Sequence, residues 1–273
     1  MTDKISLAGD LGSGKSTVSD ILIRELGAEY YSTGSIVRSL AARYDMSITD
    51  FNAYMETHPE IDNQIDEGIA ALSEVDKLLI IDSRMAWHFT KGTFKVYLST
   101  DIETSAIRIM NANRTGEHNA TLEDTIAATR RRRQSEQKRY KEQYGVDIKD
   151  LSNYSLIVDT TYIAPDRVAS VITESFRLWS KNKDSRFCYV APERLNYIDD
   201  APDAELIGKY SCDIEEGRAV PEVTVFECDG EFYVESGLEA ALAYAFNMYD
   251  LVPTRLIKGE AGDRKYVKMA NSI

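Results

Sequence analysis

The stretch that decides the fold lies at residues 9–16 and reads Gly9-Asp10-Leu11-Gly12-Ser13-Gly14-Lys15-Ser16. It matches the pattern G-x-x-x-x-G-K-[ST] at every fixed position. The preceding residues, Lys4 to Ala8, predict a short buried strand, and Ser16 to Leu26 have the apolar spacing of a helix. A glycine-rich turn between a strand and a helix is the context in which this pattern forms a phosphate-binding loop, or P-loop.

Each position of this loop has a mechanical reason. Glycines let backbone N–H groups point inward around a polyphosphate, Lys15 neutralises the terminal phosphates, and Ser16 can hold magnesium. The alternative, a glycine-rich turn with a surface lysine, does not account for the strand and helix on either side. We therefore expect ATP and Mg²⁺ as cofactors, with Ser16 as metal ligand, and a nucleotide site formed by Gly9, Leu11, Gly12, Ser13, Gly14, Lys15, Ser16 and Thr17.

Outward from the loop, short apolar segments alternate with helix-length segments. Strands are predicted at Ala28 to Tyr31, Lys77 to Asp82, Phe94 to Leu98 and Ser155 to Val158. This alternation predicts an α/β fold, a three-layer α/β/α P-loop NTPase with a mostly parallel sheet.

The pattern of predicted elements changes after a predicted helix that runs from Pro165 to about Lys181. The polar segment 181–186 is typical of a linker, and beyond it Asp229-Gly230 joins two predicted strands as a hairpin, followed by a helix from Leu238 to about Tyr249. The sequence therefore predicts two domains, residues 1–181 and a small α+β domain at residues 187–273.

Bulk composition excludes several classes of function. The net charge of −13 over 273 residues argues against a nucleic-acid partner, because affinity for a polyanion requires excess Lys and Arg. The three cysteines show no C-x-x-C spacing, so we expect reduced thiols rather than a zinc site. No apolar stretch approaches the length of a membrane span, and we expect no membrane partner and a cytoplasmic protein.

A P-loop alone does not distinguish kinases from other NTPases, so other polar residues must decide. Asp82 ends a predicted strand and Arg84 follows it, at the sheet edge where α/β folds bind ligands. Arg132, Glu136 and Arg139 are spaced i, i+4 and i+7 and share one helix face. Arg132 lies in a run of four arginines, residues 130–133. Instead of forming part of a substrate site, this run could bind nucleic acid or form a solvent-exposed helix face.

Several segments resemble, in order, the blocks of the cytidylate kinase-like family, specifically its smaller archaeal-type branch. They are Glu29-Tyr30-Tyr31-Ser32-Thr33-Gly34, Asp50-Phe51-Asn52, His58-Pro59-Glu60-Ile61-Asp62, Ile81-Asp82-Ser83-Arg84, and residues 135–147, SEQKRYKEQYGVD. The resemblance covers about residues 1 to 175. It implies a P-loop nucleoside monophosphate kinase.

The resemblance also implies roles for individual residues. Ser32 and Gly34 open the monophosphate-binding helix, Arg38 and Arg84 hold the acceptor phosphate, and Asp82 lies near the metal or the attacking oxygen. The alternative for Arg38 is a solvent-exposed helix residue with no binding role. The alternative for Asp82 is a cap for the helix that follows it. The family more often has glycine where Ser83 stands.

The helix that carries Arg132 adjoins the closing lid in the resembled family. There Arg132 and Glu136 contact the sugar or base of the acceptor and Arg139 bridges the phosphates. Arg108 and Arg114 are expected in the same lid and to contact the donor. The expected catalytic residues are Lys15, Asp82, Arg132 and Arg139; no catalytic base is needed, because positioning and charge stabilisation supply most of the rate of phosphoryl transfer.

The C-terminal region, residues 219–257, weakly resembles the ParB and sulfiredoxin-like nucleotide-binding fold. Leu238 and Glu239 stand where that family commonly has His or Arg, so we expect a packing module or a homo-oligomer contact there, with partner recognition or substrate gating as the second reading.

The first functional hypothesis is transfer of the γ-phosphate of ATP to a nucleoside monophosphate, CMP or dCMP. A P-loop kinase for another small metabolite and a regulatory nucleotide-binding protein with weak kinase activity are the alternatives.

Overall fold

The computed structural model describes residues 3–112 and 121–271, and these residues form two compact units. Unit 1 consists of Met1–Leu156 and Pro165–Ser185, and unit 2 of Ile157–Ala164 and Arg186–Ile273. The division after Ser185 falls in the polar segment 181–186. The segment Ile157–Ala164 groups with unit 2 although it precedes the last helix of unit 1.

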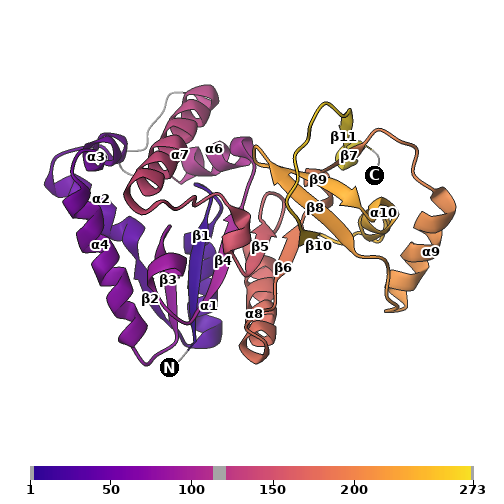
Figure 1. Ribbon diagram of the computed structural model, residues 1–273, viewed down its shortest axis with the longest axis horizontal. Helices are drawn as coiled ribbons and strands as arrows, with labels where there is room; N and C mark the ends of the chain where they lie inside the picture. Colours follow the sequence, from indigo (N-terminus) through magenta and orange to yellow (C-terminus); the bar gives the residue numbers. More distant parts are fainter. Residues whose placement is uncertain (1–2, 113–120, 272–273) are drawn as a thin grey trace. The chain divides into compact units, whose positions relative to one another are not determined.

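Unit 1 alternates strands and helices from its first residues onward (Figure 1). Its strands are β1 (Lys4–Gly9), β2 (Glu29–Ser32), β3 (Leu79–Asp82) and β4 (Thr93–Ser99). Its helices are α1 (Lys15–Leu26), α2 (Thr33–Arg43), α3 (Ile48–Met55), α4 (Pro59–Ala71), α5 (Ala86–Phe89), α6 (Ile102–Asn111), α7 (Leu122–Tyr144) and α8 (Pro165–Lys181). Strand β5 (Leu156–Asp159) begins in unit 1 and continues in unit 2.

The sheet of unit 1 has the order β4-β1-β3-β2 and is parallel throughout. Every residue of the central strand β1 is buried, so helices cover both faces of the sheet. Helices α1 and α8 pack against each other, and α5 packs on β1 and β4. The α/β fold and the mostly parallel sheet predicted from the sequence are confirmed.

This arrangement positions the P-loop. In a parallel sheet all strands end at the same edge, so the residues that follow β1 and β3 meet there. Ile5, Leu7, Ile80 and Val96 are fully buried between the layers and hold the strands in register. The loop after β1 therefore rests on a rigid support.

Unit 2 is smaller and has a mixed sheet. Its strands are β6 (Phe187–Val190), β7 (Leu195–Ile198), β8 (Val223–Cys228), β9 (Glu231–Ser236), β10 (Val252–Leu256) and β11 (Tyr266–Lys268), in the order β11-β7-β9-β8-β10-β6. Its helices are α9 (Ala204–Glu215) and α10 (Leu238–Phe246), which pack against each other. The predicted hairpin is present as β8 and β9; Asp229 and Gly230 both have positive φ, as a tight two-residue hairpin turn requires.

A buried polar network connects residues 157–164, the first segment of unit 2, to the sheet of that unit. Arg194, which is 2% exposed, donates to Glu231 at 2.9 Å and to the carbonyl of Gly230 at 2.6 Å. Its Nε lies 3.7 Å from the carboxylate of Asp159, which also accepts bonds from the backbone and side chain of Thr161. These contacts explain why residues 157–164 group with unit 2.

Candidate active site

The P-loop has a shape that only glycine permits at two positions. Gly12 has φ +72 and Gly14, which caps α1, has φ +83, a conformation that other residues rarely adopt. A Cβ on Gly12 would also lie 2.6 Å from the carbonyl oxygen of Ser105 in α6. The loop is therefore pressed against α6, with the N-terminus of α1 left open for an anion.

Lys15 folds back over the loop. Its Nζ donates to the carbonyl oxygens of Gly9 at 3.2 Å and Asp10 at 2.8 Å. Burial, followed by the nearby charge of Arg84, lowers the pKa of Lys15 to about 7. An anion placed beside this amine would restore its proton, so the site is prepared for a phosphate.

The buried side chain of Asp10 links the P-loop to the residues that pack beneath it. Its carboxylate accepts from the Tyr97 hydroxyl at 2.9 Å, the Thr100 backbone N–H at 3.1 Å and the Lys149 amine at 3.0 Å, and Arg133 of α7 lies 3.7 Å away. Burial alone would raise the pKa of Asp10, but Lys149 and Arg133 hold it well below its ordinary value. The buried charge thereby joins the loop to β4 and α7.

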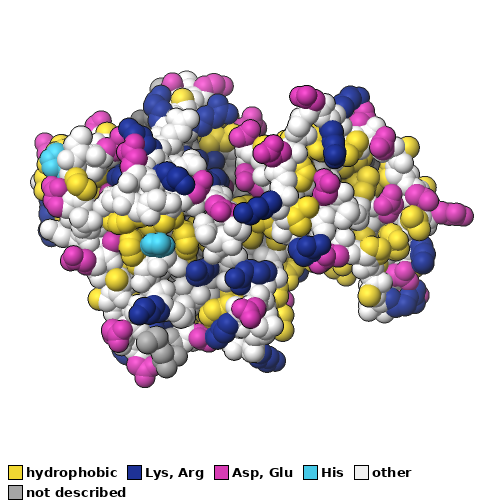
Figure 2. All heavy atoms as spheres, viewed as in Figure 1, with side chains coloured by type: hydrophobic (Ala, Val, Ile, Leu, Met, Phe, Trp, Pro, Cys, Tyr) yellow, Lys and Arg dark blue, Asp and Glu magenta, His cyan; other side chains and the backbone are white. Residues whose placement is uncertain are grey.

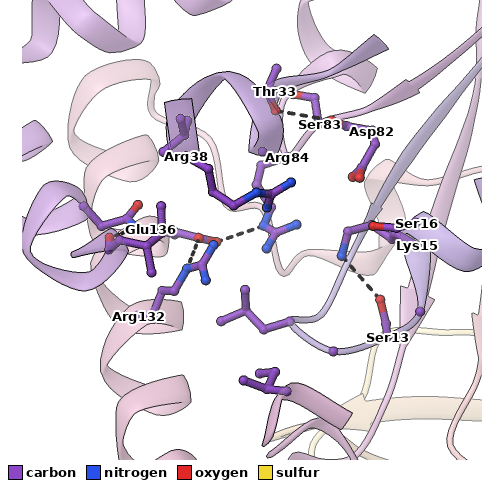
Figure 3. Close-up of a pocket in the computed structure, with 18 of the residues that line it drawn as sticks. Ser13, Lys15, Ser16, Thr33, Arg38, Asp82, Ser83, Arg84, Arg132 and Glu136 are labelled. Carbon is purple, nitrogen blue, oxygen red and sulfur yellow. Dashed lines mark hydrogen bonds and ion pairs between the residues drawn. The ribbon is translucent and has the colours of Figure 1, made fainter. Parts of the chain in front are cut away.

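One pocket opens from the P-loop and reaches helices α2, α3 and α7 (Figure 3). It is lined by Leu11, Gly12, Ser13, Gly14, Lys15, Ser16, Thr17, Thr33, Gly34, Val37, Arg38, Ile48, Asn52, Asp82, Ser83, Arg84, Ile109, Arg132, Glu136, Arg139 and Tyr140. Residues from six separate segments of unit 1 thus meet in one cavity.

Glu136 holds two of the arginines in this pocket. Its carboxylate accepts from Nε of Arg84 at 2.8 Å and from Nε of Arg132 at 3.2 Å, and all three side chains are largely buried (Figure 3). Burial alone would raise the pKa of Glu136, but Arg84 and Arg132 lower it to about 2. The acid is therefore ionised and fixes the orientation of both guanidinium groups.

Arg139 has a different partner. Its Nε lies 2.8 Å from the carboxylate of Asp62 in α4, and its Nη1 donates to the backbone carbonyl of Asn52 in α3 at 3.3 Å. Arg139 and Asp62 are 7% and 3% exposed. The third member of the predicted helix face thus joins α7 to α3 and α4.

Asp82 lies where β3 ends, beside the P-loop. Its carboxylate accepts from the hydroxyl of Tyr30 at 3.1 Å, and its backbone carbonyl accepts from Thr33 at 3.3 Å. Figure 3 shows Asp82 and Lys15 facing the same space, with Ser16 beside them and the guanidinium of Arg38 pointing toward that of Arg84. Gly34 leaves room here, since a Cβ on it would lie 3.4 Å from Arg38 Nη1.

The remaining predicted residues lie at the margin of the pocket or beyond it. Ser32 caps α2 by accepting from the N–H of Ser35, and Arg108 donates to the carbonyl of Gly12 at 3.4 Å. Gly9 lies under the loop, where a Cβ would meet the backbone of Leu98 at 2.3 Å. Arg114, predicted in the lid, lies outside the described residues.

Several pocket residues were not singled out from the sequence. Val37, Ile48 and Tyr140 are apolar or aromatic walls, and Asn52 is a buried polar group among them. Asn52 stands four residues after Ile48 on α3, a spacing that places both on one helix face. That spacing, together with the family-like block Asp50-Phe51-Asn52, is the signal in the sequence that could have identified the pair.

The donor set fits a nucleotide with magnesium. A hydroxyl, Ser16, and a carboxylate, Asp82, line one part of the pocket beside the P-loop, and oxygen ligands of this kind suit Mg²⁺ when phosphates supply the others. Lys15 and the open N-terminus of α1 supply the positive field for the phosphates.

Comparisons with known proteins agree with this geometry. A family model described as an AAA domain matches residues 5–143, half of the chain. A cytidylate kinase from Thermoplasma acidophilum is 36% identical over 173 residues, covering 62% of this chain and 89% of that protein. This chain belongs to the cytidylate kinase family. The cytidylate kinase of Thermoplasma volcanium is 37% identical over 173 residues, covering 62% of this chain and 88% of that protein.

The family assignment confirms a P-loop kinase that phosphorylates nucleoside monophosphates. A third relative, an S-adenosylmethionine-dependent nucleotide dehydratase from Lacinutrix mariniflava, is 33% identical over 205 residues, covering 69% of this chain but 42% of that protein. The cytidylate kinase-like region is thus also found within a longer protein of another name. Within residues 3–112 and 121–271, no helix combines the length and apolarity needed to cross a membrane.

Proposed function

We propose that this enzyme transfers the γ-phosphate of ATP, with Mg²⁺, to CMP or dCMP. The observation that carries the proposal is a single pocket in which a P-loop and four arginines, Arg38, Arg84, Arg132 and Arg139, meet. Phosphoryl transfer between two nucleotides brings several negative charges together, and catalysis consists of positioning them and stabilising the charge that develops.

On the donor side, the backbone N–H groups of Gly12 to Ser16 bind the β- and γ-phosphates, and Lys15 leaves the loop carbonyls to contact them. Ser16 and Asp82 would hold the Mg²⁺ ion, which would neutralise charge on the phosphates. The Tyr30 hydroxyl donates to the Asp82 carboxylate and keeps it in place. Arg108, which lies against Gly12, contacts the donor from α6.

On the acceptor side, the N-terminus of α2 at Ser32 and Gly34 and the guanidinium groups of Arg38 and Arg84 bind the monophosphate. Arg132 completes this cluster from α7 and is held in place by Glu136. In the reaction, an oxygen of the acceptor phosphate attacks the γ-phosphorus, and the bond to the β-phosphate oxygen breaks, leaving ADP.

We also propose that residues 1–181 form the catalytic domain and that residues 187–273 form a small packing or homo-oligomerisation domain. All residues lining the pocket belong to unit 1. We propose no nucleic-acid partner, since the net charge is −13 and acidic and basic side chains are interspersed over the face drawn in Figure 2.

The proposal is tested by measuring ADP release from Mg²⁺-ATP with each nucleoside monophosphate in turn and with a panel of small hydroxyl and carboxyl metabolites. The expected result is fastest turnover with CMP or dCMP. Fastest turnover with a metabolite that carries no base would overturn it, and slow ATP hydrolysis unaffected by any acceptor would favour a regulatory nucleotide-binding protein.

A further inference from the structure

Among the charged and apolar side chains that line the pocket is the uncharged amide of Asn52. We propose that the side-chain carbonyl of Asn52 accepts a hydrogen bond from the exocyclic amino group of the acceptor base and thereby selects cytosine over uracil. This inference rests on the proposed function, because it concerns the base of the nucleotide that the same pocket would phosphorylate.

The orientation of the Asn52 amide is fixed by its own helix. Asn52 is 5% exposed, lines the pocket, and donates from Nδ2 to the carbonyl oxygen of Ile48 at 2.6 Å. Exchanging the amide oxygen and nitrogen would place two acceptors against each other at that distance, so the amino end must face Ile48. Oδ1 is then the end of the amide that is left for a ligand in the pocket.

Two sets of contacts hold the backbone around Asn52. The neighbouring Phe51 is fully buried in a cluster that includes Val37, Ile48 and Met55. The backbone carbonyl of Asn52 accepts from Arg139, which is itself paired with Asp62. The hydrogen-bond acceptor Oδ1 of Asn52 is therefore preorganised, and little conformational entropy is lost when a ligand binds to it.

The position of Asn52 in the pocket suits a base rather than a phosphate. Val37 and Ile48 line the pocket and pack in the same apolar cluster as Phe51, the neighbour of Asn52. Figure 1 shows α3 well away from β1, the strand that leads into the P-loop. The phosphates must lie toward the P-loop and its arginines. The base of the acceptor then reaches the walls near α3.

The chemistry of an amide carbonyl distinguishes the two pyrimidines. Cytosine carries an amino group at position 4, a donor, whereas uracil carries a carbonyl there, which cannot bond to another carbonyl. A binding site that forms a hydrogen bond with its ligand strongly rejects an analogue that lacks this bond, because a buried polar group is left unpaired. This discrimination is far stronger than the discrimination against an analogue that differs only in size. Asn52 Oδ1 thus disfavours uracil without any steric clash.

The test compares kcat/KM for CMP, UMP and the CMP analogue that lacks the 4-amino group, for the wild type, Asn52→Ala and Asn52→Ser. The wild type should prefer CMP over both others by at least about tenfold. Asn52→Ala should lower kcat/KM for CMP about tenfold or more and change the value for UMP less than about threefold. Serine keeps a donor to the Ile48 carbonyl while being too short to reach the base, so Asn52→Ser should behave like Asn52→Ala.

Asn63→Ala is the matched control, since Asn63 lies on α4, is exposed, and bonds to Gln143 and Tyr144 of α7 rather than lining the pocket. It should leave the CMP to UMP ratio unchanged. Equal losses for CMP and UMP in both Asn52 variants, or a wild type that treats CMP and its 4-deamino analogue alike, would overturn the inference while leaving the proposed function intact. A wild type that phosphorylates neither CMP nor UMP would overturn the proposed function itself.

Discussion

Replacing Glu136 with Gln removes the charge that holds Arg84 and Arg132 together. The two guanidinium nitrogens lie 2.8 and 3.2 Å from its carboxylate oxygens, and the side chain of Glu136 is 8% exposed. Burial raises the pKa of this carboxyl, yet Arg84 and Arg132 bring it from 4.5 down to about 2. Since one pKa unit corresponds to about 1.4 kcal/mol, the ionised carboxylate contributes roughly 3 kcal/mol to stability at pH 7.

The sign of the pH dependence follows from the lowered pKa. The contribution is present in full above the unfolded pKa of 4.5 and is lost as the pH falls through the folded pKa of about 2. The difference in unfolding free energy between wild type and Glu136→Gln should therefore be constant between about pH 6 and 8 and should shrink below about pH 4.5.

Urea denaturation followed by tryptophan fluorescence measures this difference. The chain has two tryptophans, Trp87 and Trp179, and both are buried in unit 1, so the signal reports the unit that contains Glu136. Glu56→Gln is the control, because Glu56 also contacts α7, through Ser135 and Lys138, but is partly exposed. A loss below about 0.5 kcal/mol for Glu136→Gln at pH 7, equal to that of the control, would refute the reasoning.

Three further outcomes follow from the site. Lys15→Ala should leave a folded protein and lower turnover by about a hundredfold or more, because a charge on the transferring phosphoryl group is lost; turnover near normal in the coupled assay would contradict the donor site. Because the pKa of Lys15 is lowered to about 7, ATP binding at pH 8 should take up a proton, seen as calorimetric heats that differ between HEPES and Tris and absent in Lys15→Ala. A chain ending at Lys181 should remain folded and bind ATP, since every pocket residue precedes that position; aggregation or non-cooperative unfolding would contradict the division into domains.

The sequence predicted the parts of the site that depend on local patterns. The P-loop is contiguous, Arg84 follows a buried strand, and the spacing of Arg132, Glu136 and Arg139 places them on one face of α7. Residues 11–16 of the loop line the same pocket as Arg84 and these three residues of α7. Strand and helix periodicity was sufficient here, because a parallel sheet brings strand ends to one edge.

Contacts between distant segments could not be predicted in this way. Arg139 lies in the pocket as part of the predicted helix face, but its ion pair with Asp62, 77 positions earlier in the sequence, has no local signal that marks it. Asp10 fills an unspecified position of the loop pattern, and its role depends on Tyr97 and Lys149. Strands β6, β7 and β11 were not predicted, because each is short, three or four residues, and has no tight hairpin signal beside it.

The most direct test of the central claim follows the γ-phosphate itself. ATP labelled at the γ-position is incubated with the enzyme, Mg²⁺ and CMP, and the labelled products are separated, with Lys15→Ala as the matched inactive control. The account predicts that the label appears in CDP and that its rate of appearance equals the rate of ADP release. Label found in inorganic phosphate at the same rate with or without CMP would contradict it.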